Sequence, residues 1–148
     1  MARYVCAADA VALAATTLKT VCELATPAGE SADLISWWIE FDGTDSTKAP
    51  IKVELLRATA AATGTSTGTA APCDENEAAS ASCTWKYGAT GEGTPGTVLE
   101  IHRIPFTSGT YIFYPLDQRY KAKASGFLRI RCTAPATVNA TVGMMWTE

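Results

Sequence analysis

The sequence of 148 residues has little of what enzymes and metal sites commonly need. It has one histidine, His102, so no pair of imidazoles can share catalysis or bind a metal together. Its five cysteines form no CxxC pair and show no zinc-finger spacing. We therefore expect no metal site, no cofactor and no enzymatic activity.

Charge and long apolar runs are also scarce. Charged residues make up 18% of the chain, below the usual share of about 25%. Lys and Arg number 12 against 15 Asp and Glu, and without a basic excess we expect no nucleic-acid partner. The apolar run at residues 10–15 is far shorter than the ~20 residues of a membrane span. Asp9 would interrupt a signal-peptide core. We expect no membrane partner and a protein made and folded in a cytoplasm.

Two motif-like features lack the context that their chemistry requires. Residues 64–68 match GxSxG, a hydrolase motif that needs a buried strand before the serine and a helix after it. Ala and Thr runs flank these residues instead, which indicates a loop. His102 lies within a predicted strand, on the same face as Glu100, and no nucleophile is indicated beside it. We expect Ser66 and His102 to be catalytically silent.

Alternation of apolar and polar residues with period two is the strongest signal in the chain. It recurs in short segments separated by turn residues, and no segment keeps a helical spacing. About eight short strands of this kind are typical of sandwiches and barrels. The sequence predicts an all-β fold, a single-domain antiparallel β-sandwich over residues 1–148, jelly-roll-like and with long loops. The residues predicted to share its core are Ile35, Trp37, Ile39, Val53, Leu55, Leu99, Ile101, Leu128, Ile130 and Val142.

Two stretches lack this alternation. Residues 58–82 are rich in Ala, Thr, Gly and Ser, and so long a loop in a compact domain is often functional. Residues 1–15 are similar in character, and we expect an extended N-terminal arm there. Both stretches are too apolar to be solvated tethers, which favours ordering against a neighbouring chain. Cys73 and Cys83 flank one loop and could form a bridge, although buried thiols are the simpler interpretation.

Three residues are candidates for an interface. Trp38 points outward if the tryptophan before it points into the core, and an exposed Trp suits a binding surface. A covering loop or second layer is the alternative. Arg129 and Arg131 share the outward face of one strand, where two like charges need partners. They could pair with Glu54 or Glu100 in the same chain or with another chain, and we favour pairing within the chain.

Several segments carry a further signal. They are residues 11–21, 38–43, 50–57 and 64–66 and, most strongly, IPFTSG at 104–109, PL at 115–116 and GFLRIRCTAPA at 126–136. Together they resemble small β-rich proteins encoded among the head genes of tailed bacteriophages. The resemblance covers most of the chain and rests on structural motifs, so it bears more directly on the fold than on the role.

The resemblance implies a virion structural protein, similar to capsid decoration or cement proteins, that binds the outer capsid surface and stabilises the head. Its partners would be the major capsid protein and further copies of itself, as a homotrimer. Many weak contacts at symmetric positions would then add up to a large stabilisation. The alternative is a tail or host-surface module of the virion that binds a glycan. Clustered exposed aromatic residues beside acidic loops would favour that alternative.

Overall fold

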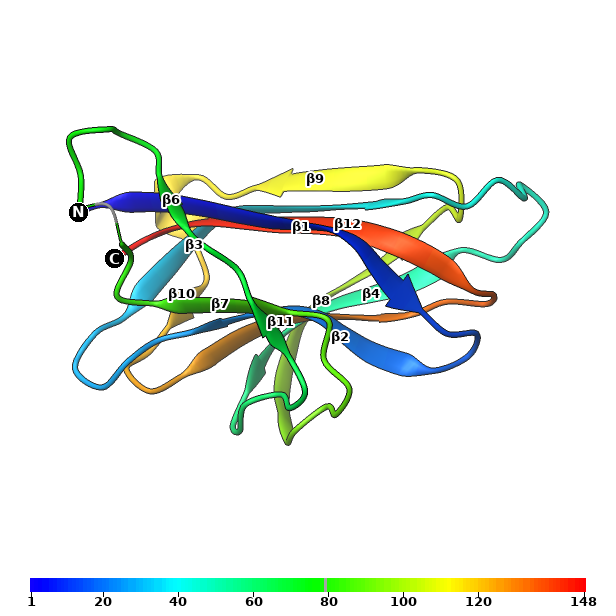
Figure 1. Ribbon diagram of the computed structural model, residues 1–148, viewed down its shortest axis with the longest axis horizontal. Helices are drawn as coiled ribbons and strands as arrows, with labels where there is room; N and C mark the ends of the chain where they lie inside the picture. Colours follow the sequence, from blue (N-terminus) through cyan, green and yellow to red (C-terminus); the bar gives the residue numbers. More distant parts are fainter. Residues whose placement is uncertain (79) are drawn as a thin grey trace.

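The chain folds into two antiparallel β-sheets that lie face to face in a computed structural model, which describes residues 1–78 and 80–148 (Figure 1). A short 3-10 helix, η1 (Leu116–Gln118), follows the strand β9. Sheet I holds β1 (Arg3–Leu13), β3 (Ala32–Phe41), β6 (Ala71–Pro72), β9 (Gly109–Phe113), β10 (Lys121–Ala122) and β12 (Val138–Thr147). Sheet II holds β2 (Leu18–Ala25), β4 (Ile51–Ala58), β5 (Ser66–Thr67), β7 (Thr84–Tyr87), β8 (Pro95–Ile104) and β11 (Phe127–Thr133).

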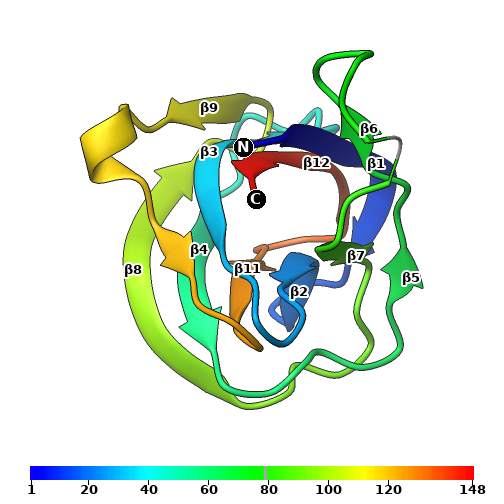
Figure 2. The same ribbon diagram turned by 90° about the vertical axis from the view of Figure 1, so that its left-hand side faces the viewer.

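The strand order follows a jelly roll. Sheet I runs β10-β3-β12-β1-β6, with β9 also paired to β3, and sheet II runs β5-β7-β2-β11-β4-β8. The chain therefore crosses between the sheets from β1 to β2, from β2 to β3 and from β3 to β4, and again from β11 to β12. This interleaving of two Greek keys is the jelly-roll arrangement. The predicted all-β antiparallel sandwich is confirmed, and Figure 2 shows its two layers end-on.

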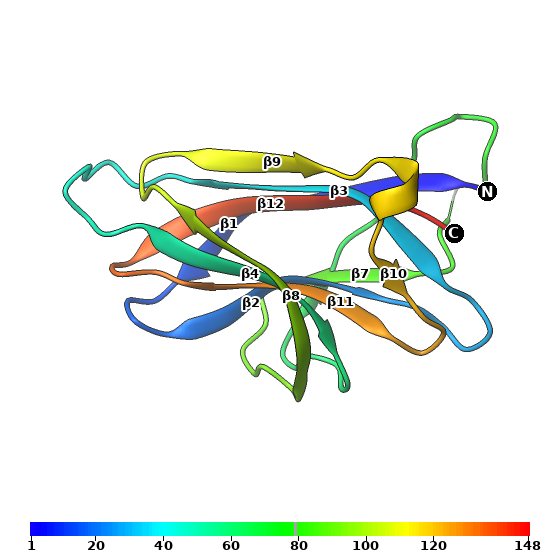
Figure 3. The same ribbon diagram turned by 180° about the vertical axis from the view of Figure 1, so that it is seen from behind.

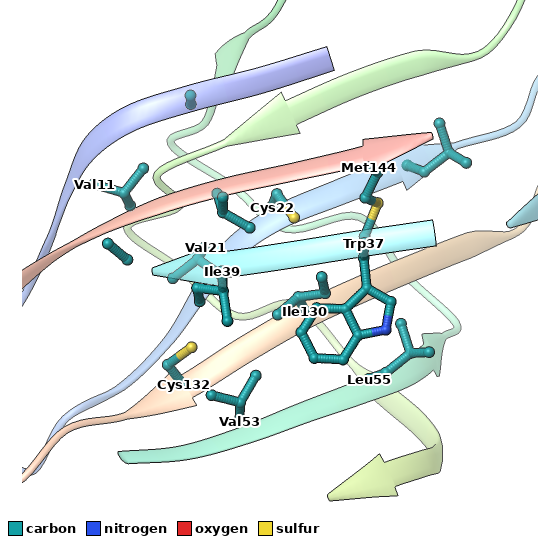
Figure 4. Packing of buried hydrophobic residues seen from close by; sticks show 14 of the residues in the cluster. Val11, Val21, Cys22, Trp37, Ile39, Val53, Leu55, Ile130, Cys132 and Met144 are labelled. Atoms are coloured by element: carbon teal, nitrogen blue, oxygen red, sulfur yellow. The ribbon is translucent and has the colours of Figure 1, made fainter. Parts of the chain in front are cut away.

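The core lies between the two sheets, as the alternation predicts. Seven of the predicted core residues are fully buried in one cluster, and Figure 4 shows part of it, with the Trp37 indole lying between the layers. These seven are Trp37, Ile39, Val53, Leu55, Leu128, Ile130 and Val142. Ile35 is buried but lies outside the cluster, because the register shifts there and Leu34 takes the inward position opposite Trp146.

The predicted face of β8 is wrong. Ile101 is 57% exposed and Leu99 only packs against the margin of the core. His102 pairs with Val53, and Glu100 pairs with Leu55, so these two polar residues share the inner face with core residues of β4. Because β8 is the edge strand of sheet II, its inner face meets the open rim of the sandwich. Polar side chains are tolerated at such a rim, so hydrophobic alternation did not identify the inner face.

The predicted N-terminal arm is also wrong, because residues 3–13 form β1 inside sheet I. This strand pairs with β12 over almost its whole length and with β6 near its start. Tyr4, Cys6, Val11 and Leu13 are buried in the core cluster. A register shift between Ala8 and Val11 breaks the alternation, which explains why the sequence pattern did not indicate a strand.

The long stretch at residues 58–82 folds back on its own sandwich. Its two short strands pair with β7 and β1. Nearer the start of the stretch, the Ala60 carbonyl accepts a hydrogen bond from Arg129 and the Ala62 amide donates one to Glu23, both on sheet II. Ala79, within this stretch, lies outside the described residues. These contacts within the chain differ from the expected ordering against a neighbouring chain.

Candidate functional site

The outer face of sheet I presents an aromatic surface. Along β3, Trp37 and Ile39 point into the core, so Trp38 and Glu40 point outward. Trp38 sits opposite Tyr111 of β9, with ring centroids 6.3 Å apart and ring planes inclined by 26°. The predicted outward orientation of Trp38 agrees with the structure, and the neighbouring strand supplies it with an aromatic partner.

The neighbour of Trp38 on the other side is a glycine, which leaves room for the indole to lie flat on the sheet. Gly143 of β12 lies opposite Trp38, and a Cβ added to Gly143 would collide with the indole. The indole therefore lies over the backbone of β12 instead of standing away from the sheet. Any side chain at position 143 would lift the ring, so this glycine is needed for the close approach.

We name the group formed by Trp38, Tyr111, Phe113 and Met145 the aromatic platform. Tyr111 is 59% exposed and Phe113 57% exposed, whereas Trp38 and Met145 are half-buried. Trp38, Tyr111 and Met145, together with Glu40, Gly109 and Thr110, line a shallow hollow of about 580 Å³. Such a surface can anchor an apolar side chain of a protein or stack against a sugar ring. Figure 1 shows β9 and β3, which carry most of it, along one side of the sandwich.

Arg129 does not lie on a surface, which corrects the prediction that it belongs to an interface. The side chain is fully buried on the outer face of sheet II. Its Nη2 and Nε atoms donate to Oε2 of Glu23, also fully buried, at 2.5 and 2.8 Å. Loop residues cover this face: Arg129 also donates to the carbonyls of Ala60 and Glu92, and Glu23 accepts from the Ala62 amide.

The loop around Glu92 is held by Arg129, which binds the Glu92 carbonyl, and by Thr20. The Glu92 carboxylate accepts hydrogen bonds from the Thr20 amide and hydroxyl, each at 2.6 Å. Two loops, one before β5 and one before β8, are thereby fastened over the outer face of sheet II. The arrangement satisfies buried charges with hydrogen bonds and backbone contacts, which indicates a structural role.

Arg131 pairs within the chain, as the sequence analysis favours. Its Nε atom donates to Glu54 at 2.6 Å, and Lys52 contacts the other Glu54 oxygen at 2.7 Å. Burial raises the pKa of the Glu54 carboxyl, but the two cationic partners outweigh it and hold that pKa below its ordinary value. Arg131 is only 14% exposed in this cluster, so little of it is free to contact another molecule.

His102 lies at the rim of the sandwich and not beside a nucleophile. Its ring meets the edge of Trp37 with centroids 5.5 Å apart, and its Nε2 lies 2.9 Å from Oε2 of Glu100. Trp37 donates from Nε1 to the Tyr114 hydroxyl at 2.8 Å. Burial and then the Glu100 carboxylate raise the pKa of Tyr114 well above its ordinary value. Ser66 is on β5, at the opposite edge of sheet II from β8, so the structure does not bring Ser66 and His102 together.

The cysteines are all free thiols, so the bridge considered between Cys73 and Cys83 is not formed. Cys73 is exposed and the other four are buried. Within residues 1–78 and 80–148, no group of three or more His, Cys, Asp or Glu side chains could hold a metal ion. In the same part of the chain, no helix is long and apolar enough to cross a membrane.

Sequence reasoning missed Tyr111 and Phe113, two of the platform's residues. Residues 111–114 read Tyr-Ile-Phe-Tyr, so both faces of the strand carry large apolar groups and alternation indicates no outward side. Pairing with β3 fixes the outward face of β9, because Tyr111 lies opposite the outward Trp38 and Ile112 opposite the inward Trp37.

Comparisons with protein-family models, with curated proteins and with solved structures find no match for this chain.

Proposed function

We propose that this protein is a non-catalytic structural component of a phage virion that binds the outer capsid surface through the aromatic platform and stabilises the head. The phage part of the proposal comes from the sequence resemblance. The single observation that supports a binding role is the group of large apolar side chains on the outer face of sheet I, in which Tyr111 and Phe113 are exposed beside the half-buried Trp38 and Met145. Exposed apolar clusters of this kind commonly mark protein interaction sites.

The platform has the properties of an interface anchor. Trp and Tyr are enriched among residues that dominate binding energy, since they bury large areas with few rotatable bonds. Trp38 already packs against the backbone at Gly143 and stacks with Tyr111, so it has less side-chain entropy to lose on binding than a freely exposed indole. Repetition of one modest contact on a symmetric shell then strengthens attachment.

Self-association as a homotrimer stays a prediction. The long stretch at residues 58–82 was expected to order against a neighbouring chain, but its described contacts are with its own sandwich. The rationale for a trimer now rests on the resemblance alone. Sedimentation of the protein across the micromolar range tests it.

Co-sedimentation with assembled capsids of the phage that encodes the protein tests the docking surface. We expect Trp38→Ala to weaken binding by about 2 kcal/mol or more, which is about 30-fold, as for a central anchor residue. Leu116→Ala is the matched control, because Leu116 is 76% exposed on η1 and outside the platform. Equal capsid binding by Trp38→Ala and the parent protein contradicts docking through the platform.

The second candidate is a glycan-binding module of the virion. One observation favours it: Glu40 and Thr110 line the same hollow as Trp38 and Tyr111. A carboxylate and a hydroxyl beside exposed rings could bind sugar hydroxyls while a ring stacks on the sugar face. Glu40→Gln separates the candidates. The glycan module is favoured if the parent protein binds a glycan array but not capsids, and if Glu40→Gln abolishes the glycan binding.

A further inference from the structure

Strand β8 is a long edge strand with an unpaired side. It is the last strand of sheet II and, among the described residues, pairs with β4 and with no other strand. Figure 2 shows it curving along the outside of the molecule, and Figure 3 shows the same strand crossing in front of β4. An edge strand leaves every second residue's N–H and C=O without a ladder partner, so it is a template for another strand.

The second half of β8 is protected as an edge by the charged side chains of Glu100 and Arg103, but it lacks the bulges and prolines that protect many other edges. Its register shifts against β4 lie before Glu100, and residues 100–104 pair regularly with residues 51–55. This regular half contains no Pro or Gly, and within it Ile101 is 57% exposed. The other described sheet edges are shorter or interrupted: β5, β6 and β10 have two residues each, β9 has five and begins with Gly109, and β1 is interrupted by a register shift.

We propose that β8 binds a second copy of this chain by antiparallel strand pairing across a twofold axis at Ile101. A twofold axis normal to the sheet places residue 101 opposite itself and residue 100 opposite residue 102, each pair on one face. On the inner face, Glu100, which already contacts His102 of its own chain, then also lies opposite His102 of the second copy, and this contact occurs twice. On the outer face, Ile101 lies against Ile101 of the second copy, so exposed apolar surface is covered.

The neighbouring registers are less favourable. A centre at Glu100 sets two carboxylates against each other, and a centre at Arg103 sets two guanidinium groups against each other. A centre at His102 places Glu100 opposite the buried Ile104 of the second copy, where the carboxylate gains no partner. Only the centre at Ile101 combines an apolar pair with two acid–imidazole pairs in the regular half of β8.

This dimer is independent of the proposed capsid contact. Strand β8 belongs to sheet II, whereas the aromatic platform lies on the outer face of sheet I, so the two surfaces share no residue. The dimer also differs from the trimer that the resemblance implies. The mass of the assembly in solution separates the two.

Sedimentation of the full chain is the first test. We expect a dimer of the 15.6 kDa chain at high concentration, and a monomer for Ile101→Lys, which places two like charges at the axis. Ile101 is exposed in the single chain, so this variant should fold. Leu116→Lys, on η1, is the matched control and should remain dimeric. A parent protein that is a monomer or a trimer, or a dimer unchanged by Ile101→Lys, overturns the proposal.

A cross-linking experiment tests the register. In a Cys73→Ser background, which removes the exposed thiol, Ile101→Cys should form a disulfide-linked dimer on oxidation with copper phenanthroline. Opposed residues of antiparallel strands have Cα atoms about 4.5–5.5 Å apart, within the range that a disulfide spans. Arg103→Cys should not cross-link, because the two positions would lie four residues apart along the strands, about 13 Å. Equal cross-linking of both variants, or cross-linking of Arg103→Cys alone, overturns this register.

Discussion

Replacing Arg129 by methionine should destabilise the fold strongly, although hydrophobic alternation assigned this residue to an exposed face. The Arg129 guanidinium gives Glu23 two of its hydrogen bonds and holds the carbonyls of Ala60 and Glu92. In Arg129→Met, the fully buried Glu23 carboxylate keeps only the Ala62 amide as a partner among the described contacts. The two loop carbonyls lose their donor at the same time.

The size of the effect follows from the uncompensated charge. Breaking a fully buried ion pair by removing one partner costs about 3–5 kcal/mol. Each orphaned carbonyl adds about 1–3 kcal/mol if it stays buried, but the loops can move toward water and recover part of that. We expect a loss of about 3–5 kcal/mol in the free energy of unfolding, a large share of the 5–15 kcal/mol of a typical domain.

Denaturant unfolding of three variants checks this reasoning. Arg131→Met is the matched control on the same strand, and it should lose less, since Glu54 keeps Lys52 as a partner. The double variant Glu23→Leu with Arg129→Met should be more stable than Arg129→Met alone, because no charge is left buried without a partner. A loss below about 1 kcal/mol for Arg129→Met, within the range of an exposed ion pair, refutes the reasoning. So does a double variant that is less stable than the single one.

Three further predictions concern the whole fold. Leu128→Ala and Ile130→Ala should each lower the unfolding free energy by about 2–5 kcal/mol, and melting like the parent would show that the assigned core face is wrong. Burial raises the pKa of the Cys22 and Cys132 thiols, and Cys73 is the one exposed thiol. A thiol reagent at neutral pH should therefore label Cys73 rapidly and the other cysteines only after unfolding. Rapid labelling of more than one thiol contradicts this. Stability should fall as the pH drops below about 4.5, because carboxyls with a pKa below the ordinary value bind protons more readily when unfolded. Acid titration of unfolding checks this, and constant stability down to pH ~3 would contradict it. These carboxyls are Asp42, Asp45, Glu54, Asp74 and Glu148.

The fold could be predicted from the sequence where each strand has one buried and one solvated face. Leu128 and Ile130 alternate with arginines, and both point into the core. The same rule assigned Arg129 to solvent, since alternation separates the two faces of a sheet but does not reveal a loop that covers one of them. Ala60 and Glu92 reach Arg129 from far along the chain, and no local pattern connects these three residues.

The candidate site was predictable only in part. The outward direction of Trp38 follows from its place after an inward tryptophan, and it holds in the structure. Its flat setting depends on Gly143, which is 105 residues away in the sequence and becomes a neighbour only through the pairing of β3 with β12. At the edge of sheet II, the polar His102 and Glu100 are tolerated on the inner face because β8 is an edge strand, and β8's own sequence does not contain this property of the strand order.

The pairing of β1 with β12 has a consequence for how fast this protein folds. Ala2 and Glu148 exchange backbone hydrogen bonds of 3.1 Å, so sheet I joins the first strand to the last. Such a contact closes a loop of nearly the whole chain, and folding rates fall as contacts become less local. During synthesis, β1 must wait until residues 138–147 emerge before it can pair with β12. A circular permutant that links residues 148 and 1 and opens the turn after β3 would convert this pair into a hairpin. We expect the permutant to refold faster than the parent chain.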